Sequence, residues 1–225
     1  MSPEKQTIIL LPAYNEAATI GAVVRDVVSF GTVLVVDDGS RDGTGDLAEA
    51  AGARVLRLDT NRGYERALDA GFAEADRLGA EVVVTFDADG QFEASLLDRI
   101  LEPLRTGRAD LVLGRRPKMA RFSEGLFGLY TGLRFGIRDI LCGVKAYRID
   151  LYRAHGRFDA GRSVGTELAL ASVRRGTRFE VVEAPVGARA EGGSRFGQRW
   201  RANARILTAL RLAVAADLAR VGSQR

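Results

Sequence analysis

The residues best suited to chemistry in this sequence are two carboxylates that follow an apolar run. Asp87 and Asp89 are separated by one residue and are followed by Gly90 and Gln91. Carboxylate and amide oxygens are hard ligands that suit Mg²⁺ or Mn²⁺, and so few of them leave coordination positions for phosphate oxygens and water. An Asp-x-Asp pair alone is more often a solvated turn. The chemistry that it could support is a metal bridging a diphosphate.

Three further polar clusters also follow apolar runs. They are Pro12 to Glu16, Asp37-Asp38 and Gly114 to Arg116. Ligands of parallel α/β sheets bind at the carboxyl ends of the strands, so we expect these clusters to meet at one edge of a sheet. Carboxylates gathered there would repel one another by roughly 4 kcal/mol per pair at about 4 Å and an effective dielectric of about 20. The sequence therefore predicts a cation at this edge.

The charges are divided unevenly along the 225 residues. Residues 1–100 hold 9 Lys or Arg and 18 Asp or Glu, whereas residues 101–225 hold 24 and 11, and the whole chain has a net charge of +4. An acidic half for a divalent metal and a basic half for phosphates is expected of an enzyme that handles a metal–diphosphate substrate. A basic face alone has many explanations, so nucleic-acid binding is not expected.

Composition and the lone cysteine exclude other classes of protein. The 46% hydrophobic and 28% charged residues exclude a disordered, collagenous or many-span membrane chain. Cys142 can form no internal disulfide, and His155 is the only histidine that could activate it, so thiol catalysis is not expected. No apolar run reaches the roughly 18 residues of a membrane helix, and the first residues lack a signal peptide, which predicts a cytoplasmic protein.

The elements that must position these clusters alternate along the chain. Apolar runs without alternation, separated by helical spacing, predict a mainly parallel α/β sheet covered by helices on both faces. No linker is evident, so we expect a single domain over residues 1–225, with a nucleotide- and metal-binding half (1–116) and an acceptor-binding half (117–225). Strands are expected at residues 7–11, 32–36, 54–58, 81–86, 110–113 and 179–185, and helices at 20–28, 44–52, 61–78, 95–104, 166–175 and 198–220.

Two segments of the second half allow more than one interpretation. Glycines between residues 125 and 136 either let a helix pack closely or form a mobile wall over an apolar acceptor. The last helix carries Ile206, Leu207 and Leu210 together with arginines, so it either packs on the core or lies on a membrane surface.

The ordered motifs resemble those of family 2 glycosyltransferases, most closely the dolichol-phosphate mannosyltransferase and polyprenyl-phosphate sugar transferase branch. The resemblance spans about residues 7–196. It rests on Pro12-Ala13-Tyr14-Asn15-Glu16, Val36-Asp37-Asp38-Gly39-Ser40-Arg41-Asp42-Gly43-Thr44, Asn61-Arg62-Gly63 with Ala67 and Gly71, Asp87-Ala88-Asp89-Gly90-Gln91, Gly114-Arg115-Arg116, Asp139 to Gly143, Glu167, and Arg189 with Gly193-Ser194-Arg195.

The resemblance implies a GT-A nucleotide-sugar fold, a divalent metal (Mg²⁺ or Mn²⁺) and inversion at the transferred sugar carbon. By position it implies nucleotide or substrate contacts for Pro12, Tyr14, Glu16, Val36, Asp38, Asp87, Ala88, Asp89 and Gln91, metal ligation by Asp89, Gln91 and Asp87, and phosphate contacts for Arg116, Arg189 and Arg195. Catalytic roles are expected for Arg116, which would stabilise the leaving diphosphate, and for Glu167 or, next, Asp139 as a general base.

The acceptor stays open at this point. A lipid phosphate is already an anion and needs no strong base, whereas a hydroxyl acceptor does. Phe92-Glu93-Ala94, Arg195 and Tyr64-Glu65-Arg66 differ from the usual lipid-phosphate pattern, so a UDP- or GDP-sugar could serve a polyprenyl or dolichyl phosphate, which we favour, or a soluble hydroxyl. A basic amphipathic C-terminal helix would allow peripheral membrane contact, and a homodimer is allowed.

Enzymes of other classes fit the motifs less well. A sugar-nucleotide nucleotidyltransferase would need a Gly-rich triphosphate loop with a basic residue, where Pro12 to Glu16 is acidic. A dehydrogenase would need Gly-x-Gly-x-x-Gly after an early strand, and none is present. A noncatalytic nucleotide-binding domain would not need candidates for metal, base and phosphate contacts together.

Overall fold

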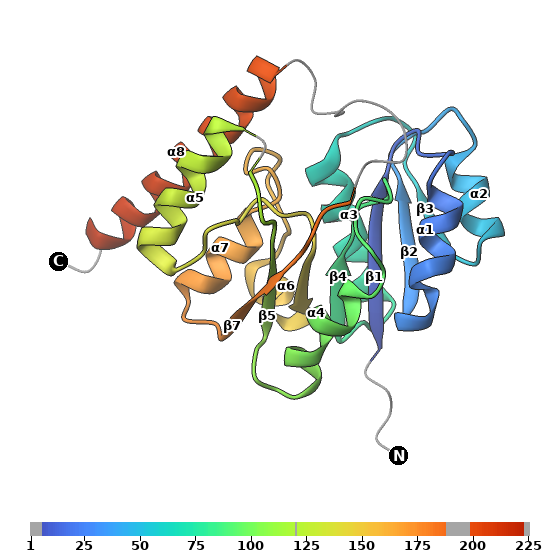
Figure 1. Ribbon diagram of the computed structural model, residues 1–225, viewed down its shortest axis with the longest axis horizontal. Helices are drawn as coiled ribbons and strands as arrows, with labels where there is room; N and C mark the ends of the chain where they lie inside the picture. The colour runs from blue at the N-terminus through green and yellow to red at the C-terminus, as the bar shows by residue number, and fades with distance from the viewer. Residues whose placement is uncertain (1–5, 120, 188–198, 223–225) are drawn as a thin grey trace.

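A mostly parallel sheet forms the centre of the molecule. The computed structural model describes residues 6–119, 121–187 and 199–222. Within them the sheet has the order β3-β2-β1-β4-β6-β5-β7, and every strand but β6 runs parallel to the rest (Figure 1). The strands are β1 (Thr7–Ala13), β2 (Thr32–Asp37), β3 (Arg54–Arg57), β4 (Val82–Thr85), β5 (Leu111–Arg115), β6 (Lys145–Arg148) and β7 (Phe179–Glu183).

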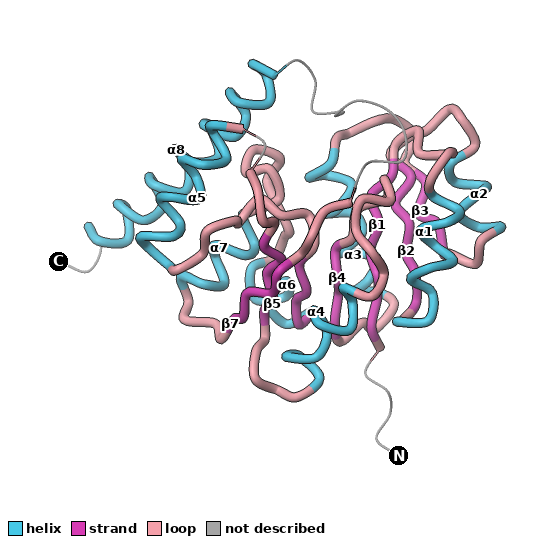
Figure 2. The backbone as a smooth tube through the Cα atoms, in the orientation of Figure 1, coloured by secondary structure: helices cyan, strands magenta, loops and turns pink. Residues whose placement is uncertain are grey.

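Helices cover both faces of the sheet, as the apolar strands require (Figure 2). The helices are α1 (Ile20–Val27), the short 3-10 helix η1 (Val28–Phe30), α2 (Thr44–Ala50), α3 (Tyr64–Arg77), α4 (Leu96–Arg105), α5 (Phe122–Phe135), α6 (Ile149–His155), α7 (Glu167–Arg174) and α8 (Arg199–Gly222). One buried cluster joins the sheet to α1, α2 and α4, and a second joins it to α3, α7 and α8. The predicted two-sided α/β fold is confirmed.

Strand β1 continues through a proline at which we expected it to end. Pro12 pairs with Val36 of β2 in parallel register. The pairing with β4 stops at Leu10, whose carbonyl accepts the Phe86 N–H. Residues two apart in a strand direct their backbone groups to the same side, so the N–H that Pro12 lacks would point toward β4. The pairing with β4 has already ended there, so no hydrogen bond between strands is lost.

The structure contains three elements that the apolar pattern did not predict. Helices α5 and α6 and strand β6 all lie between residues 122 and 155. Strand β6 is four residues long and begins with a buried lysine, so it lacks the pattern of a core strand. It nevertheless inserts between β4 and β5, antiparallel to both.

The glycine-rich segment proves to be the helix α5. At Gly128 a Cβ would overlap the Arg138 carbonyl, so this glycine permits close packing of the chain that follows the helix. At Gly125 an added Cβ would meet no atom of another segment within 4 Å. The close-packing interpretation therefore holds at Gly128, and other side chains of α5 form an exposed surface.

Helix α8 packs on the core along one side. Ala202, Ile206, Ala209 and Ala213 are buried there. Among the helices that the structure describes, none combines the length and apolarity needed to cross a membrane.

Candidate functional site

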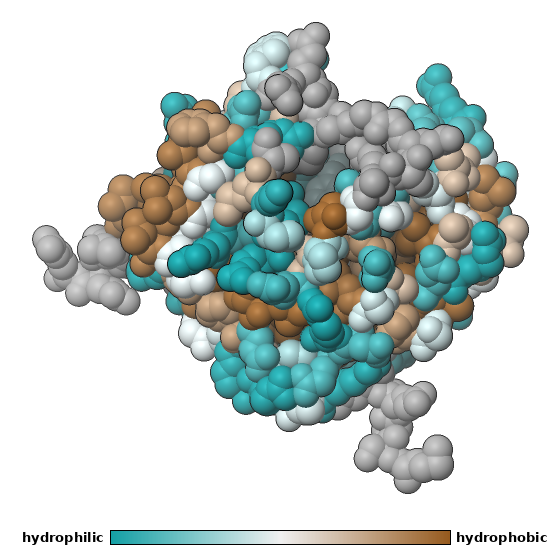
Figure 3. Space-filling view, viewed as in Figure 1, coloured by the Kyte–Doolittle hydropathy of each residue, from teal (hydrophilic) through white to brown (hydrophobic). Residues whose placement is uncertain are grey.

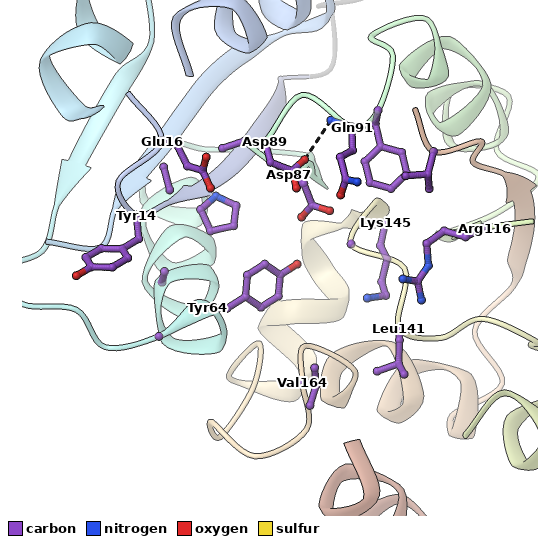
Figure 4. A pocket seen from close by; sticks show the side chains of 18 of the residues that line it. Tyr14, Glu16, Tyr64, Asp87, Asp89, Gln91, Arg116, Leu141, Lys145 and Val164 are labelled. Carbon is purple, nitrogen blue, oxygen red and sulfur yellow. Dashed lines mark hydrogen bonds between the residues drawn. The ribbon is translucent and has the colours of Figure 1, made fainter. Parts of the chain in front are cut away.

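A cavity of about 780 Å³ opens at the carboxyl ends of β1, β2 and β4 (Figure 4). It gathers side chains that are far apart in the chain, as the strand-end argument predicts. Of the residues predicted from sequence, those that line it are Pro12, Tyr14, Glu16, Asp38, Asp87, Ala88, Asp89, Gln91 and Arg116. Val36, Asp139 and Glu167 are not in the lining, and Arg189 and Arg195 lie outside the described residues.

The loop after β2 fixes the turn after β1. The Ser40 hydroxyl accepts the Asn15 N–H at 2.9 Å, and the Thr44 hydroxyl accepts the Glu16 N–H at 2.8 Å. These bonds hold Asn15 in a left-handed conformation with φ 51°. The turn presents Tyr14, which is 38% exposed, toward the cavity. The two motifs therefore lie together because hydroxyls of the second bond the backbone of the first.

Asp38 shapes the cavity from a third direction. Its two carboxylate oxygens accept the Arg62 N–H at 2.7 Å and the Gly63 N–H at 2.8 Å. These bonds hold the chain that enters α3. The side chain is 3% exposed and still lines the cavity, so Asp38 fixes the wall in addition to facing it. Val36 instead packs in the core, where it lies against the backbone of Gly71.

The carboxylates of Asp87 and Asp89 enter the cavity from the end of β4. The Asp89 carboxylate accepts the Gln91 N–H at 3.1 Å, and Gly90 turns the chain between them with φ +72°. The Asp87 carboxylate lies against Gly143, where any Cβ would overlap both of its oxygens. The loop before β6 therefore shapes the position of Asp87.

The donor set fits a divalent cation that shares its ligands with a substrate. Within the described residues, no group of three or more His, Cys, Asp or Glu side chains is placed to hold a metal alone. Two carboxylates and the amide of Gln91 line the same cavity. Oxygen ligands in this number suit Mg²⁺ or Mn²⁺ when diphosphate oxygens complete the coordination shell.

Arg116 faces these carboxylates from the end of β5. Its Nε and one terminal nitrogen each donate to the Asp139 carboxylate at 2.8 Å. Asp139 also accepts the Arg116 backbone N–H at 3.0 Å. Burial raises the pKa of Asp139, but its bonds to Arg116 and the nearby positive charge outweigh burial and leave that pKa below its usual value. Asp139 thus positions Arg116 and is poorly suited to accept a proton.

Lys145 is a cavity residue that we did not predict. It is 3% exposed, and its ammonium donates to the Gly165 carbonyl at 3.2 Å. Burial lowers the pKa of this lysine, while the charges of Asp139 and Asp87 oppose that shift. The available signal was a lysine flanked by Val144 and Ala146. Such a charge is rarely buried without a partner or a ligand.

Glu167 lies apart from this constellation. Its carboxylate accepts bonds from the Ala160 N–H at 2.8 Å and from Arg157 at 2.5 Å, and it lies 3.1 Å from His155. Burial raises the pKa of Glu167, but these bonds outweigh it and lower that pKa overall. In this structure Glu167 holds the chain around residue 160 and lies outside the lining of the cavity, and its role as a base stays a prediction.

The second half of the chain closes the cavity with apolar and basic side chains. Leu141, Val164, Val186 and Ile206 line it, and so do Lys118, Arg121 and Arg205. Arg205 of α8 is paired at 2.5 Å with Glu65 of α3, which is 3% exposed. This pair joins the last helix to α3 beside the cavity.

Comparison with known proteins gives related sequences over most of the chain. The model for glycosyl transferase family 2 matches residues 8–132. Undecaprenyl-phosphate mannosyltransferase of Micrococcus luteus is 35% identical over 205 residues, which cover 80% of this chain and 82% of that protein. Polyprenol monophosphomannose synthase of Mycolicibacterium smegmatis is 30% identical and the match covers 82% of this chain and 77% of that protein.

A solved structure with the same fold is glucosyl-3-phosphoglycerate synthase from Mycobacterium tuberculosis. Its complex with phosphoglyceric acid has a TM-score of 0.74 and 25% identity, and the match covers 92% of this chain and 80% of that one. Its complex with Mn²⁺ and UDP-glucose has a TM-score of 0.76 at 23% identity, covering 93% and 79%, a likeness that shows the fold alone. The predicted GT-A fold is confirmed.

Proposed function

Because the chain belongs to glycosyl transferase family 2, we propose that it transfers a sugar from a nucleoside-diphosphate sugar to a polyprenyl phosphate. The observation that carries this proposal is one cavity that brings together the carboxylates of Asp87 and Asp89, several cations and an apolar wall. A nucleotide diphosphate with its metal suits the carboxylates, and a phosphate on an apolar chain suits the cations and the wall. The names of the two relatives that act on undecaprenyl phosphate and polyprenol support the same acceptor class.

The donor is proposed to bind at the ends of β1, β2 and β4. Tyr14, which lines the cavity, would pack against a base or ribose, and Asp87, Asp89 and Gln91 would hold Mg²⁺ or Mn²⁺. A metal bound there supplies positive charge to the diphosphate leaving group. The proposed donor is a UDP- or GDP-sugar.

The acceptor phosphate is proposed to bind near Arg116 and Lys145. Both cations line the cavity, and Leu141 and Ile206 give an apolar surface beside them. The two expected bases, Glu167 and Asp139, are both engaged by arginines. A phosphate acceptor is already ionised and needs neither of them, which favours it over a hydroxyl.

The reaction proposed at this site is a single displacement. A phosphate oxygen of the acceptor attacks the anomeric carbon from the face opposite the donor diphosphate. A new carbon–oxygen bond forms, the bond to the nucleotide breaks, and its electron pair leaves with the nucleoside diphosphate. Arg116 and Lys145 would offset the negative charge of the reacting groups, and the configuration of the sugar carbon would invert.

Product analysis tests the proposal directly. The protein is incubated with GDP-mannose, UDP-glucose or UDP-N-acetylglucosamine and with farnesyl phosphate or phosphoglyceric acid, with Mn²⁺, with Mg²⁺ or with a chelator. We expect one donor to yield a metal-dependent farnesyl phosphosugar whose anomeric configuration, read by NMR, is opposite to that of the donor.

The Asp89→Asn variant tests the metal assignment against Asp98→Asn, a change at an exposed carboxylate of α4. We expect Asp89→Asn to reduce transfer on the order of 100-fold and Asp98→Asn to leave it unchanged. Transfer to phosphoglyceric acid with none to farnesyl phosphate would overturn the acceptor class. Full transfer by Asp89→Asn would overturn the metal site.

A further inference from the structure

Helices α5 and α8 lie side by side and run in the same direction (Figure 1). Near their first turns the Ser123 hydroxyl donates to the Asn203 side chain at 2.6 Å. About two turns further along α5 and about four turns further along α8, the Tyr130 hydroxyl contacts the Asp217 carboxylate. These contacts, which join matching ends, fix the side that each helix turns toward the other.

The inner side of this helix pair is buried. Phe127 and Thr131 of α5 and Ile206 and Ala209 of α8 are at most 2% exposed. The acidic side chains in the described part of both helices are Glu124 and Asp217. Glu124 pairs with Arg121 and Arg116, and Asp217 pairs with Arg174.

The opposite side carries large apolar residues. A helix advances about 100° per residue, which places residues 122, 126, 129 and 133 in a strip roughly 60° wide and residues 200, 207 and 218 in a narrower one. On each helix the strip lies about a quarter turn around the helix axis from the side that contacts the other helix. The quarter turn runs in opposite rotational senses on the two helices. Because the helices are parallel, both strips therefore face the same way. We call the combined surface the outer face: Phe122, Leu126, Leu129, Leu133, Trp200, Leu207 and Leu218.

The outer face is unusually exposed for apolar side chains. Phe122 and Leu133 are 80% and 82% exposed, and Leu129, Trp200 and Leu218 are 60%, 62% and 67% exposed. Figure 3 shows hydrophobic residues gathered at the end of the molecule where α5 and α8 lie. Contiguous apolar surface of this kind marks an interaction site.

The charge around this face is positive. Arg201 and Arg211 are exposed on α8, and the Arg201 guanidinium lies 5.2 Å from the centre of the Trp200 ring. By the same spacing of about 100° per residue, Arg211 lies within the strip of α8 and Arg201 about a quarter turn from it. Both acidic side chains named above are paired away from this face. Apolar side chains with a tryptophan, together with arginines within and beside them, match the apolar and anionic layers of a lipid surface.

We propose that the outer face of α5 and α8 seats the protein on an anionic membrane surface. This proposal rests on the proposed function, because a polyprenyl phosphate lies in a membrane with its phosphate at the surface. An enzyme that uses this acceptor has to reach that surface. Arg121 precedes Phe122, and Arg205 and Ile206 lie just beyond Trp200, and all three line the cavity. The outer face therefore begins at the basic, apolar side of the cavity, where the acceptor would enter.

Sedimentation with vesicles tests the surface without any acceptor present. The probes are vesicles of phosphatidylcholine alone and of phosphatidylcholine with an equal part of phosphatidylglycerol. The variant Leu129→Ser/Leu133→Ser is compared with Val28→Ser/Leu47→Ser, which changes two apolar side chains that are each 45% exposed elsewhere. We expect the first variant to lose about tenfold or more of the parent's partitioning and the second to keep it.

Charge is tested with Arg211→Gln and with salt. We expect Arg211→Gln to weaken binding to the anionic vesicles, and about 1 M salt, which shortens the screening length to about 3 Å, to weaken it further. Circular dichroism checks that each variant is folded. Equal partitioning of the parent and Leu129→Ser/Leu133→Ser would overturn the proposal. A second result would also overturn it: the parent binds neither vesicle and forms a dimer in sedimentation velocity, and only Leu129→Ser/Leu133→Ser abolishes that dimer. A second copy of the chain would then cover the outer face.

Transfer to farnesyl phosphate in solution separates this proposal from the proposed function. Leu129→Ser/Leu133→Ser should retain that transfer at the parent's rate while losing transfer to undecaprenyl phosphate in vesicles. If the parent binds vesicles but transfers sugar to neither acceptor, the proposed function is overturned, whereas the proposed membrane-binding surface is retained. Unchanged transfer to undecaprenyl phosphate in vesicles by Leu129→Ser/Leu133→Ser would overturn the proposed membrane-binding surface.

Discussion

Asp139 holds the guanidinium of Arg116 at two points, with both nitrogen–oxygen distances at 2.8 Å. The Asp139 side chain is 2% exposed and that of Arg116 is 20% exposed, so the pair is shielded from solvent. An arginine held in this way presents its remaining N–H groups in a fixed direction. The pair therefore joins two residues expected from sequence in separate roles into one structural unit.

Changing Asp139 should mainly lower stability, whereas changing Arg116 should mainly lower activity. Asp139→Ala leaves Arg116 charged and half-buried without its carboxylate, so we expect a loss of about 3 kcal/mol in the free energy of unfolding, measured in urea. Arg116→Lys keeps the charge but loses the two-point contact, so kcat should fall by about tenfold or more. An Arg116→Lys enzyme with the parent's kcat would show that guanidinium geometry is unimportant.

Gly143→Ala should disable the site while sparing the fold. The new methyl group would overlap the Asp87 carboxylate, which is the end of a side chain and can move away. We expect transfer to fall on the order of 100-fold, with a melting temperature close to the parent's. Gly125→Ala is the control, because a Cβ added there meets no atom of another segment within 4 Å, and it should leave transfer unchanged. Normal transfer by Gly143→Ala would show that the position of Asp87 is not critical.

Lys145→Met should trade activity for stability. Methionine fills a similar volume and removes a buried ammonium whose described partner is one carbonyl oxygen. We expect the free energy of unfolding to stay the same or rise, whereas transfer should fall on the order of 100-fold because a cation beside the phosphates is lost. Thermal unfolding and steady-state kinetics measure the two effects. A strongly destabilised variant with unimpaired transfer would assign Lys145 a structural role instead.

The buried hydroxyl of Tyr147 makes no hydrogen bond within the described structure. Burial raises the pKa of Tyr147, so the group stays neutral, and the hydroxyl still carries a desolvation cost. Tyr147→Phe should therefore be neutral or stabilise the fold by about 1 kcal/mol. Tyr130→Phe is the contrast, because its hydroxyl contacts Asp217, and it should destabilise by about 1 kcal/mol. Urea unfolding of both variants would reveal equal effects if burial alone governed them.

Glu167→Gln should affect stability more than transfer. The pKa of Glu167 is lowered in the folded protein from 4.5, so its ionised form stabilises the fold above about pH 4.5, and this contribution is lost as the pH falls through the lowered value. The stability difference between parent and variant should therefore be largest near neutral pH and shrink in acid. Unfolding measured from neutral pH to below pH 4 checks this. A large fall in kcat with unchanged stability would restore Glu167 as the base.

The structure gives physical reasons for what could and could not be predicted at the site. The strand-end clusters could be predicted because carboxyl ends of parallel strands meet at one edge whatever the helices do. Lys145 could not, because it reaches the cavity through β6, a short antiparallel strand with no apolar pattern. Glu167 illustrates the converse: its place in a motif was visible, but its engagement by Arg157 and the Ala160 N–H was not.

The order of apolar runs and polar clusters by itself determined the parallel sheet, its two helical layers and the edge at which Asp38, Asp87 and Asp89 gather. These follow from local periodicity and from the geometry of parallel strands, both of which are written in contiguous residues. Only the tertiary structure decided that Gly143 admits the Asp87 carboxylate, that Asp139 serves Arg116, and that the strips of α5 and α8 form one face. Each depends on the relative placement of segments joined through long stretches of chain, which local pattern does not encode.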